Sequence, residues 1–192
     1  MKNLTPSYLK HQFLIAMPHM DDPHFAQTLT YIVEHNADGA MGLVINRPQD
    51  LTLADVLEQL RPEQLPPVRC QQIRIHSGGP VQTDRGFVLH AAKSGTNYTS
   101  SMSVPGGLEM TTSKDVLEAV ASGTGPERFL LTLGHAGWGA GQLEEEISKN
   151  GWLTVEADPK IVFDVPAEER FEAALALLGI SSTMLSGEAG HA

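Results

Sequence analysis

Residues 134–147, GHAGWGAGQLEEEI, have the composition in this sequence that is most suited to a binding site. Four glycines fall within eight positions, and His135 and Trp138 lie between them. Glycine is costly to order, so it is typical of places where the backbone turns tightly or approaches a ligand closely. Because an apolar run at 129–133 precedes the segment and a helical pattern follows it, we expect residues 134–142 to form a shaped loop.

Two interpretations of this loop stay open. In the first, the loop binds a ligand through His135, Gly137, Trp138 and Gly139. In the second, it is a tight turn whose glycines make room for the ring of Trp138. In both we expect Trp138 to be largely buried and Gly137 or Gly139 to have a positive φ. A nucleotide phosphate is disfavoured, because the glycine spacing is not G-x-G-x-x-G and the acidic run 144–146 would repel an anion.

Asn46, Arg47 and Pro48 follow another apolar run, which places an amide and a guanidinium at the end of a strand. A guanidinium can bind a carboxylate or a phosphate through two parallel hydrogen bonds. The alternative is a turn held by Asn46, with Arg47 on the surface. Arg47 would belong to a cleft if it met His90 and His135 in space, which spacing alone does not determine.

His19, Asp21, Asp22 and His24 crowd into the segment MPHMDDPHF. These side chains are suitable metal ligands, but their spacing matches no established zinc or calcium pattern. We therefore interpret the segment as a turn with solvated histidines and expect neither a metal site nor a cofactor.

The segment HSGGP, residues 76–80, resembles the glycine-rich oxyanion loops of esterases. An esterase also needs a nucleophile, and the sequence contains no G-x-S-x-G motif. The sequence therefore disfavours a serine hydrolase, and a glycine turn before the next strand explains these residues.

Cys70 is the single cysteine of the chain, so no intrachain disulfide can form and a reducing compartment is indicated. The neighbouring cations Arg69 and Arg74 make Cys70 a candidate redox sensor. The alternative, which we favour, is an inert thiol at a strand edge, unless one of the two guanidinium groups points at the sulfur.

The charge balance argues against direct binding of nucleic acid. Lys and Arg number 13 and Asp and Glu 23, for a net charge of −10, and no basic run supplies the phosphate contacts that such binding requires. No apolar run approaches the roughly 20 residues of a membrane span. We therefore expect a cytoplasmic protein that binds neither DNA nor a membrane directly.

Periodicity predicts an α+β fold in one domain covering residues 1–192. Apolar runs of strand length lie at 13–17, 29–33, 41–45, 73–75, 87–89, 129–133, 153–155 and 161–165. About four flanking helices are indicated at 52–60, 112–120, 141–150 and 166–179, the first two with a possible capping box. Since strands and helices neither alternate nor separate cleanly, we expect a mixed sheet. Residues 93–107 suggest a mobile loop or hairpin, and 181–192 a poorly ordered tail.

The last predicted helix has the clearest limits. Pro166 stands at its start, Gly179 at its end, and an apolar stripe lies between them at i, i+3, i+4 and i+7. We expect the residues of this stripe to be buried: Phe171, Ala174, Leu175 and Leu178.

Taken together, several segments resemble the AlgH/YqgE family. They are FLIAMPHMDDPHF at 13–25, GAMGLVINRP at 39–48, SGGPV at 77–81, RGFVLH at 85–90, LGHAGWGAGQLEEEI at 133–147 and WLTVEAD at 152–158. The resemblance covers nearly the whole chain in the same order. It implies a single α+β domain with coiled and bifurcated sheets, and it brings no established catalytic residues.

The resemblance and the composition leave two functional hypotheses. The first is a cytoplasmic protein that regulates alginate (exopolysaccharide) production indirectly, through an unknown protein or small-molecule partner; the family name implies the link to alginate. The second is a small-molecule-binding protein or enzyme with a cleft near residues 134–142.

Overall fold

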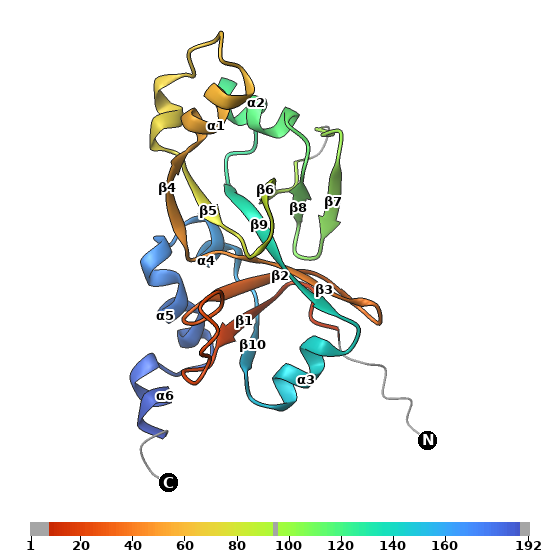
Figure 1. Ribbon diagram of the computed structural model, residues 1–192, viewed down its shortest axis with the longest axis vertical. Helices are drawn as coiled ribbons and strands as arrows, with labels where there is room; N and C mark the ends of the chain where they lie inside the picture. The colour runs from red at the N-terminus through yellow and green to blue at the C-terminus, as the bar shows by residue number, and fades with distance from the viewer. Residues whose placement is uncertain (1–7, 94–95, 189–192) are drawn as a thin grey trace.

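The computed structural model describes residues 8–93 and 96–188 (Figure 1). Its strands are β1 (Gln12–Ala16), β2 (Leu29–Asn36), β3 (Gly39–Val44), β4 (Pro48–Thr52), β5 (Arg74–Ser77), β6 (Val81–Ala91), β7 (Ser101–Val104), β8 (Leu108–Thr111), β9 (Phe129–Gly139) and β10 (Trp152–Glu156). Its helices are α1 (Leu53–Leu60), the 3-10 turn η1 (Val68–Gln72), α2 (Asp115–Ser122), α3 (Gln142–Ser148), α4 (Pro159–Phe163), α5 (Ala167–Leu177) and α6 (Ser182–Glu188).

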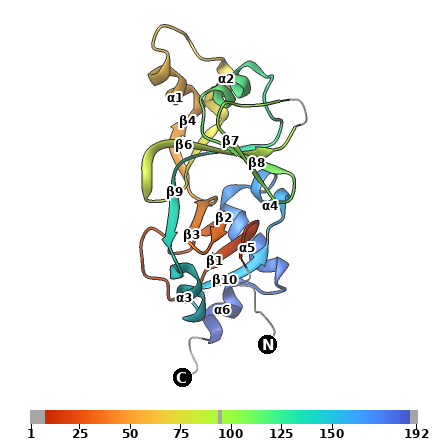
Figure 2. The same cartoon turned by 90° about the vertical axis from the view of Figure 1, so that its right-hand side faces the viewer.

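The long strand β9 joins the two halves of the sheet. The strand order is β10-β1-β2-β3-β9-β6-β8-β7, and β5 pairs with β4 and, in parallel, with β9. Residues 136–139 of β9 pair with β3, whereas 129–133 pair with β6. Two perpendicular views show β9 running from the end that carries α1 and α2 to the end that carries α3 (Figures 1 and 2). The expected mixed α+β fold is confirmed.

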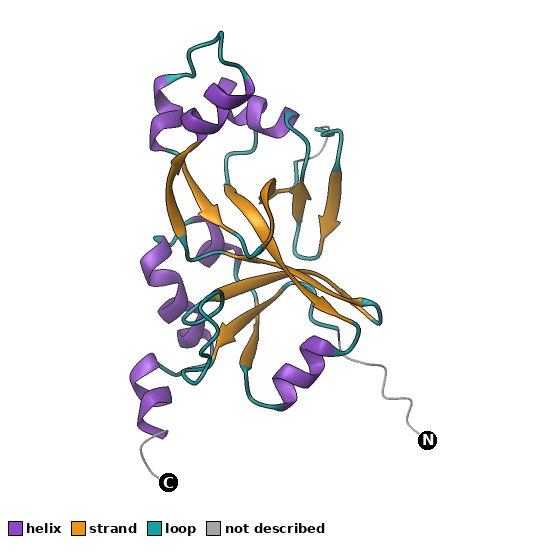
Figure 3. Cartoon of the chain, in the orientation of Figure 1, coloured by secondary structure: helices purple, strands orange, loops and turns teal. Residues whose placement is uncertain are grey.

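Strand β1 shows why the centre of the sheet is apolar on both faces. Phe13 and Ile15 point into the main core, which α4 and α5 cover. Leu14 and Ala16 point the other way, into a second cluster beside α3. Because successive side chains of a strand alternate between faces, a strand buried on both sides becomes a continuous apolar run. Helices therefore lie along the sheet and at both of its ends (Figure 3).

The start of α1 and the end of α5 follow the local sequence signals, whereas the start of α2 does not. The Thr52–Asp55 capping box starts α1, and Gly179, with φ of +73°, follows the end of α5. The capping box expected at Thr112 is wrong: α2 begins at Asp115, whose carboxylate instead accepts hydrogen bonds from Thr99 and Ser113. The Asp115 carboxylate therefore holds the neighbouring loop at Thr99 instead of forming a capping box with Thr112, because a short polar side chain can hydrogen-bond either to its own helix end or to a nearby segment.

The apolar stripe of α5 is buried only in its middle. Ala174 and Leu175 are fully buried and Phe171 packs partly against the core, but Leu178 is 40% exposed. The expectation for Leu178 is therefore wrong: α5 ends at Leu177, and Leu178 is the C-cap residue that follows it.

Two further expectations are corrected. Residues 161–165 are not a strand: Asp158 caps helix α4, and Pro159 occupies its first turn. The tail expected at 181–192 begins with helix α6, whose Leu185 packs against the core; residues 189–192 lie outside the described part of the chain. Of 93–107, expected as a mobile loop or hairpin, residues 101–104 are strand β7, which pairs with β8 just beyond this range; residues 94 and 95 lie outside the described part of the chain.

Candidate functional site

The glycine-rich segment is strand rather than loop. Strand β9 continues to Gly139, so Gly137 pairs with Met41 and Gly139 with Gly39. Neither Gly137 nor Gly139 has a positive φ, which makes that expectation wrong. Trp138 is 6% exposed, so its predicted burial is confirmed.

Close backbone packing explains why glycine is needed here. Gly134 has a φ of +76°, and a Cβ there would overlap the carbonyl oxygen of Gly79. A Cβ on Gly39 would overlap the carbonyl oxygen of Trp138 in the same way. The glycines therefore let β9 approach its neighbours closely, which favours the packing interpretation of 134–139.

The three candidate residues Arg47, His90 and His135 have separate surroundings. The Nε2 atom of buried His90 lies 2.8 Å from the Thr111 hydroxyl, and His90 pairs with Phe129 of β9. His135 is six residues further along β9, about 20 Å at roughly 3.3 Å per residue.

His135 packs edge-on against Phe87, with 5.1 Å between ring centroids. Burial, with the nearby Arg85 guanidinium, lowers the pKa of His135. Among the described residues its buried Nδ1 has no hydrogen-bond partner. Arg47 instead binds the loop before β2, so the structure does not bring the three together.

Cys70 is buried and the flanking cations are engaged elsewhere. The Arg69 guanidinium donates hydrogen bonds to the carbonyl oxygens of Val120 and Ala121 at the end of α2. Arg74 lies 3.3 Å from the Asp50 carboxylate. This arrangement agrees with an inert thiol.

The segment at 17–25 forms a loop between β1 and β2. In it, Asp22 Oδ1 accepts hydrogen bonds from the backbone N–H of His24 and lies 3.1 Å from its Nδ1. Within residues 8–93 and 96–188, no group of three or more His, Cys, Asp or Glu side chains could hold a metal ion.

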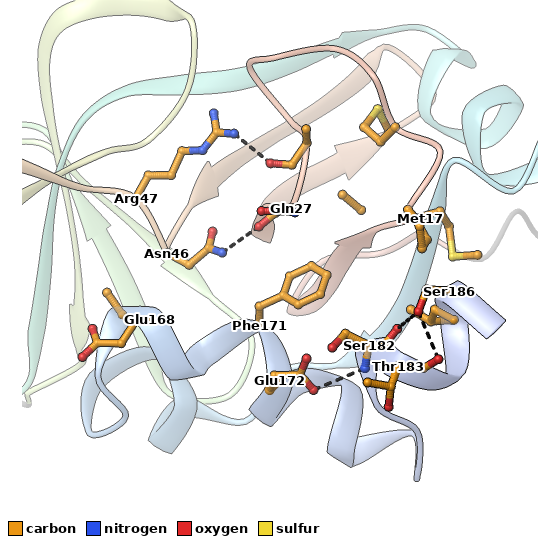
Figure 4. Close-up of a pocket in the computed structure, with 16 residues that line it drawn as sticks. Met17, Gln27, Asn46, Arg47, Glu168, Phe171, Glu172, Ser182, Thr183 and Ser186 are labelled. Atoms are coloured by element: carbon orange, nitrogen blue, oxygen red, sulfur yellow. Dashed lines mark hydrogen bonds between the residues drawn. The ribbon is translucent and has the colours of Figure 1, made fainter. Parts of the chain in front are cut away.

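A groove of about 750 Å³ runs between this loop and helices α5 and α6 (Figure 4). It is hereafter called the α5–α6 groove. Its lining residues are Ala16, Met17, Pro18, Met20, Ala26, Gln27, Asn46, Arg47, Ala167, Glu168, Phe171, Glu172, Ser182, Thr183, Leu185 and Ser186. Residues 134–142 do not line it.

Asn46 and Arg47 build one wall of the groove. Asn46 accepts a hydrogen bond from the backbone of Leu29 and donates one to the carbonyl of Gln27, at 2.9 and 3.0 Å. Arg47 donates to the carbonyls of His24 and Ala26, at 2.7 and 2.8 Å. Gln27 is held with φ of 60°, a conformation rare outside glycine and more common at functional sites. The two candidates thus position the loop that borders the groove.

The opposite wall comes from α5 and α6. The carboxylate of Glu172 accepts a hydrogen bond from the backbone of Ser182 at 3.3 Å, which ties the two helices together. Ser186 donates to the carbonyls of Ser182 and Thr183. Sequence reasoning missed this wall, although Ser181 before the short run ending at Leu185 is typical of a helix start.

The groove can bind but carries no recognisable catalytic set. Met17, Met20, Phe171 and Leu185 supply apolar surface, and two carboxylates and three hydroxyls surround it. Histidine and lysine are missing from its lining, and no hydroxyl there is hydrogen-bonded to a base. Nucleophilic catalysis normally requires such a pair.

The comparisons agree with this architecture. A family model described as AlgH-like matches residues 13–183. The chain is 71% identical to a UPF0301 protein of Paraburkholderia phytofirmans over 185 residues, covering 96% of this chain and 95% of the relative. It is 64% identical to the UPF0301 protein AlgH of Pseudomonas aeruginosa, over the full length of both.

Two solved structures are also similar. The solution structure of AlgH from Pseudomonas aeruginosa superposes with a TM-score of 0.81, covering all of both chains. A crystal structure of a protein from Corynebacterium diphtheriae has a TM-score of 0.72 at 20% identity, covering 93% of this chain and 91% of that one, and shows the fold alone. No described helix is both long and apolar enough to cross a membrane. On the family match and the full-length identity, the chain belongs to the AlgH-like family of UPF0301 proteins.

Proposed function

We propose that this protein is a cytoplasmic, non-catalytic regulator that binds a short segment of a partner protein in the α5–α6 groove. The observation that carries the proposal is the construction of the groove. Asn46 and Arg47 hold one wall in a fixed conformation, and the Glu172–Ser182 contact fixes the other. A wall held before binding loses less entropy when the ligand arrives.

The size and lining of the groove fit an apolar side chain flanked by basic residues. A volume of about 750 Å³ lies within the range of ligand sites. Met17 and Met20 offer flexible apolar surface, which suits peptides of varied shape. Glu168 and Glu172 at the rim, together with the net charge of −10, favour Lys or Arg next to the buried side chain.

An indirect role in exopolysaccharide regulation is consistent with this site. The link to alginate comes from the family resemblance alone and is part of the proposal. A net charge of −10 disfavours the many phosphate contacts that DNA binding requires, so we expect its effect on expression to pass through a partner rather than through DNA. The enzyme alternative near 134–142 has no supporting observation, because those residues belong largely to a sheet strand.

The proposal can be tested with peptides selected on the purified protein. Peptides from a random display library should be enriched for an apolar residue flanked by Lys or Arg. Their affinity, measured by fluorescence anisotropy, should fall at least about tenfold in Thr183→Arg, because the new side chain fills the groove and neutralises its rim.

Thr124→Arg is the matched control. Like Thr183, Thr124 is exposed and its hydroxyl lies 2.9 Å from that of a serine two residues earlier, but it stands beyond α2. Thr124→Arg should bind as the wild type does. Equal binding by both variants and the wild type, or enrichment of acidic peptides, would contradict the proposal.

A further inference from the structure

Three segments that stand out in the sequence meet at a second, smaller cavity. His24 comes from the MPHMDDPHF segment, Arg47 from the asparagine–arginine–proline turn, and Ser77 from the HSGGP segment. This polar hollow has a volume of about 180 Å³ and is lined by His24, Val44, Arg47, Ser77, Gly79, Pro80 and Thr83. We propose that the polar hollow binds a phosphate group.

Arg47 supplies the positive charge. Two of its five N–H donors are used by the carbonyls of His24 and Ala26, which leaves the others for a ligand. Because those two carbonyls already fix the guanidinium, a bound anion does not have to immobilise a long flexible side chain. Guanidinium groups bind phosphate through pairs of charge-assisted hydrogen bonds.

The remaining donors come from three other places in the chain. The Nδ1 atom of His24 faces Asp22 at 3.1 Å, which leaves Nε2 available. Ser77, at the end of β5, and Thr83, in β6, both line the hollow, and each carries a hydroxyl that can donate a hydrogen bond to a phosphate oxygen. Donors that approach from four segments suit the tetrahedral oxygens of a phosphate better than the two coplanar oxygens of a carboxylate.

The charges around the hollow are compatible with an anion. None of its lining residues is acidic. Two carboxylates are adjacent to lining residues: Asp22, whose Oδ1 lies 3.1 Å from Nδ1 of His24, and Asp84, which follows Thr83 in the chain. Glu168 lines the α5–α6 groove on the other side of Arg47. Serine hydrolysis is not supported here, because among the described residues no hydrogen bond joins Ser77 to His24.

One wall of the hollow is rigid backbone. Gly79 has a φ of +149°, and a Cβ at that position would overlap the backbone of His135. The turn therefore cannot move toward β9, and its glycines are explained by packing.

This site is distinct from the α5–α6 groove, although Arg47 borders both. The experiment is therefore built on Ser77 and Thr83, which line only the hollow. Inorganic phosphate is titrated into the full-length protein at constant ionic strength, and backbone amide and His24 ring shifts are followed by NMR. Sodium acetate in a parallel titration distinguishes phosphate from a carboxylate.

We expect saturable phosphate shifts confined to residues around 24, 47, 77–80 and 83. Thr83→Val and Ser77→Ala should each weaken phosphate binding about tenfold, since each removes one hydrogen bond to a charged ligand. Thr124→Val, the matched control, and Thr183→Arg should bind phosphate as the wild type does. Peptide binding in the groove should be unchanged in Thr83→Val, so the two proposals can fail separately.

The inference would be overturned by phosphate shifts that are scattered or do not saturate. Unchanged phosphate affinity in both Thr83→Val and Ser77→Ala would also overturn it. Acetate binding as tight as phosphate would exclude the proposed ligand class.

Discussion

Replacing His76 with glutamine should reduce the loss of stability that the protein undergoes between pH 6.5 and pH 4. His76 lies in β5 and is 7% exposed. Its Nε2 lies 3.3 Å from Nη1 of the buried Arg170, and its Nδ1 lies 3.3 Å from the carbonyl of Leu131. Because a guanidinium only donates hydrogen bonds, the neutral ring must carry its proton on Nδ1.

Burial and the neighbouring Arg170 lower the pKa of His76 from 6.5 to about 4. The unfolded chain therefore binds one more proton than the folded protein between these two values. Stability from this group is complete above pH 6.5 and is lost as the pH falls toward 4. At about 1.4 kcal/mol per pKa unit, the loss amounts to about 3 kcal/mol.

The assay is urea unfolding of the wild type and His76→Gln at several pH values between 4 and 7.5. Glutamine keeps an acceptor for Arg170 but cannot be protonated. The variant should be less stable by about 1 kcal/mol at pH 7.5, because the contact with Leu131 is lost, and should approach or exceed the wild type near pH 4. Parallel curves over the whole range would refute the reasoning. His19→Gln, at an exposed position, should keep the wild-type slope.

Arg170→Met should lower the free energy of unfolding by about 3 kcal/mol, because the buried carbonyl of Ile45 and the partly buried carbonyl of Val165 lose their donor. An unchanged urea midpoint would contradict this. Gly39→Ala should lower the free energy of unfolding by about 3 kcal/mol, since its φ is +141° and the new Cβ would overlap the Trp138 carbonyl oxygen. Gly86→Ala is the control and should be nearly neutral, because no atom lies within 4 Å of its new Cβ. Equal melting temperatures of the two variants would contradict this prediction. Cys70 should react with iodoacetamide only as the protein unfolds, so a native reaction rate equal to that in urea would show that the thiol is accessible.

Local signals in the sequence predicted local structure correctly. The capping box at Thr52 and Asp55 involves residues three apart, and Gly179 ends a helix through its own φ. The burial of Trp138 also follows from its own chemistry. In each case the structure depends on the residue type itself or on a contact between residues a few positions apart, and both can be read from the sequence.

Long-range pairing explains what could not be predicted. The glycines of 134–139 suggested a loop because their partners, in β3 and in the turn at 77–80, are distant in the sequence. Asn46 and Arg47 were identified, but not the carbonyls of residues 24–27 that they hold. Helix α6 was missed because a helix of seven residues is stabilised by packing rather than by propensity.

The methionine methyl groups give the most direct test of peptide binding in the α5–α6 groove. Met17 and Met20 line the groove, whereas Met41, Met102 and Met110 lie elsewhere and serve as internal references. On adding a selected basic-apolar peptide to methyl-labelled protein, we expect large NMR shifts for Met17 and Met20 and none for the three reference methionines, and no shift of Met17 or Met20 in Thr183→Arg. If the signals of the reference methionines shift while those of Met17 and Met20 do not, the peptide does not bind in the α5–α6 groove.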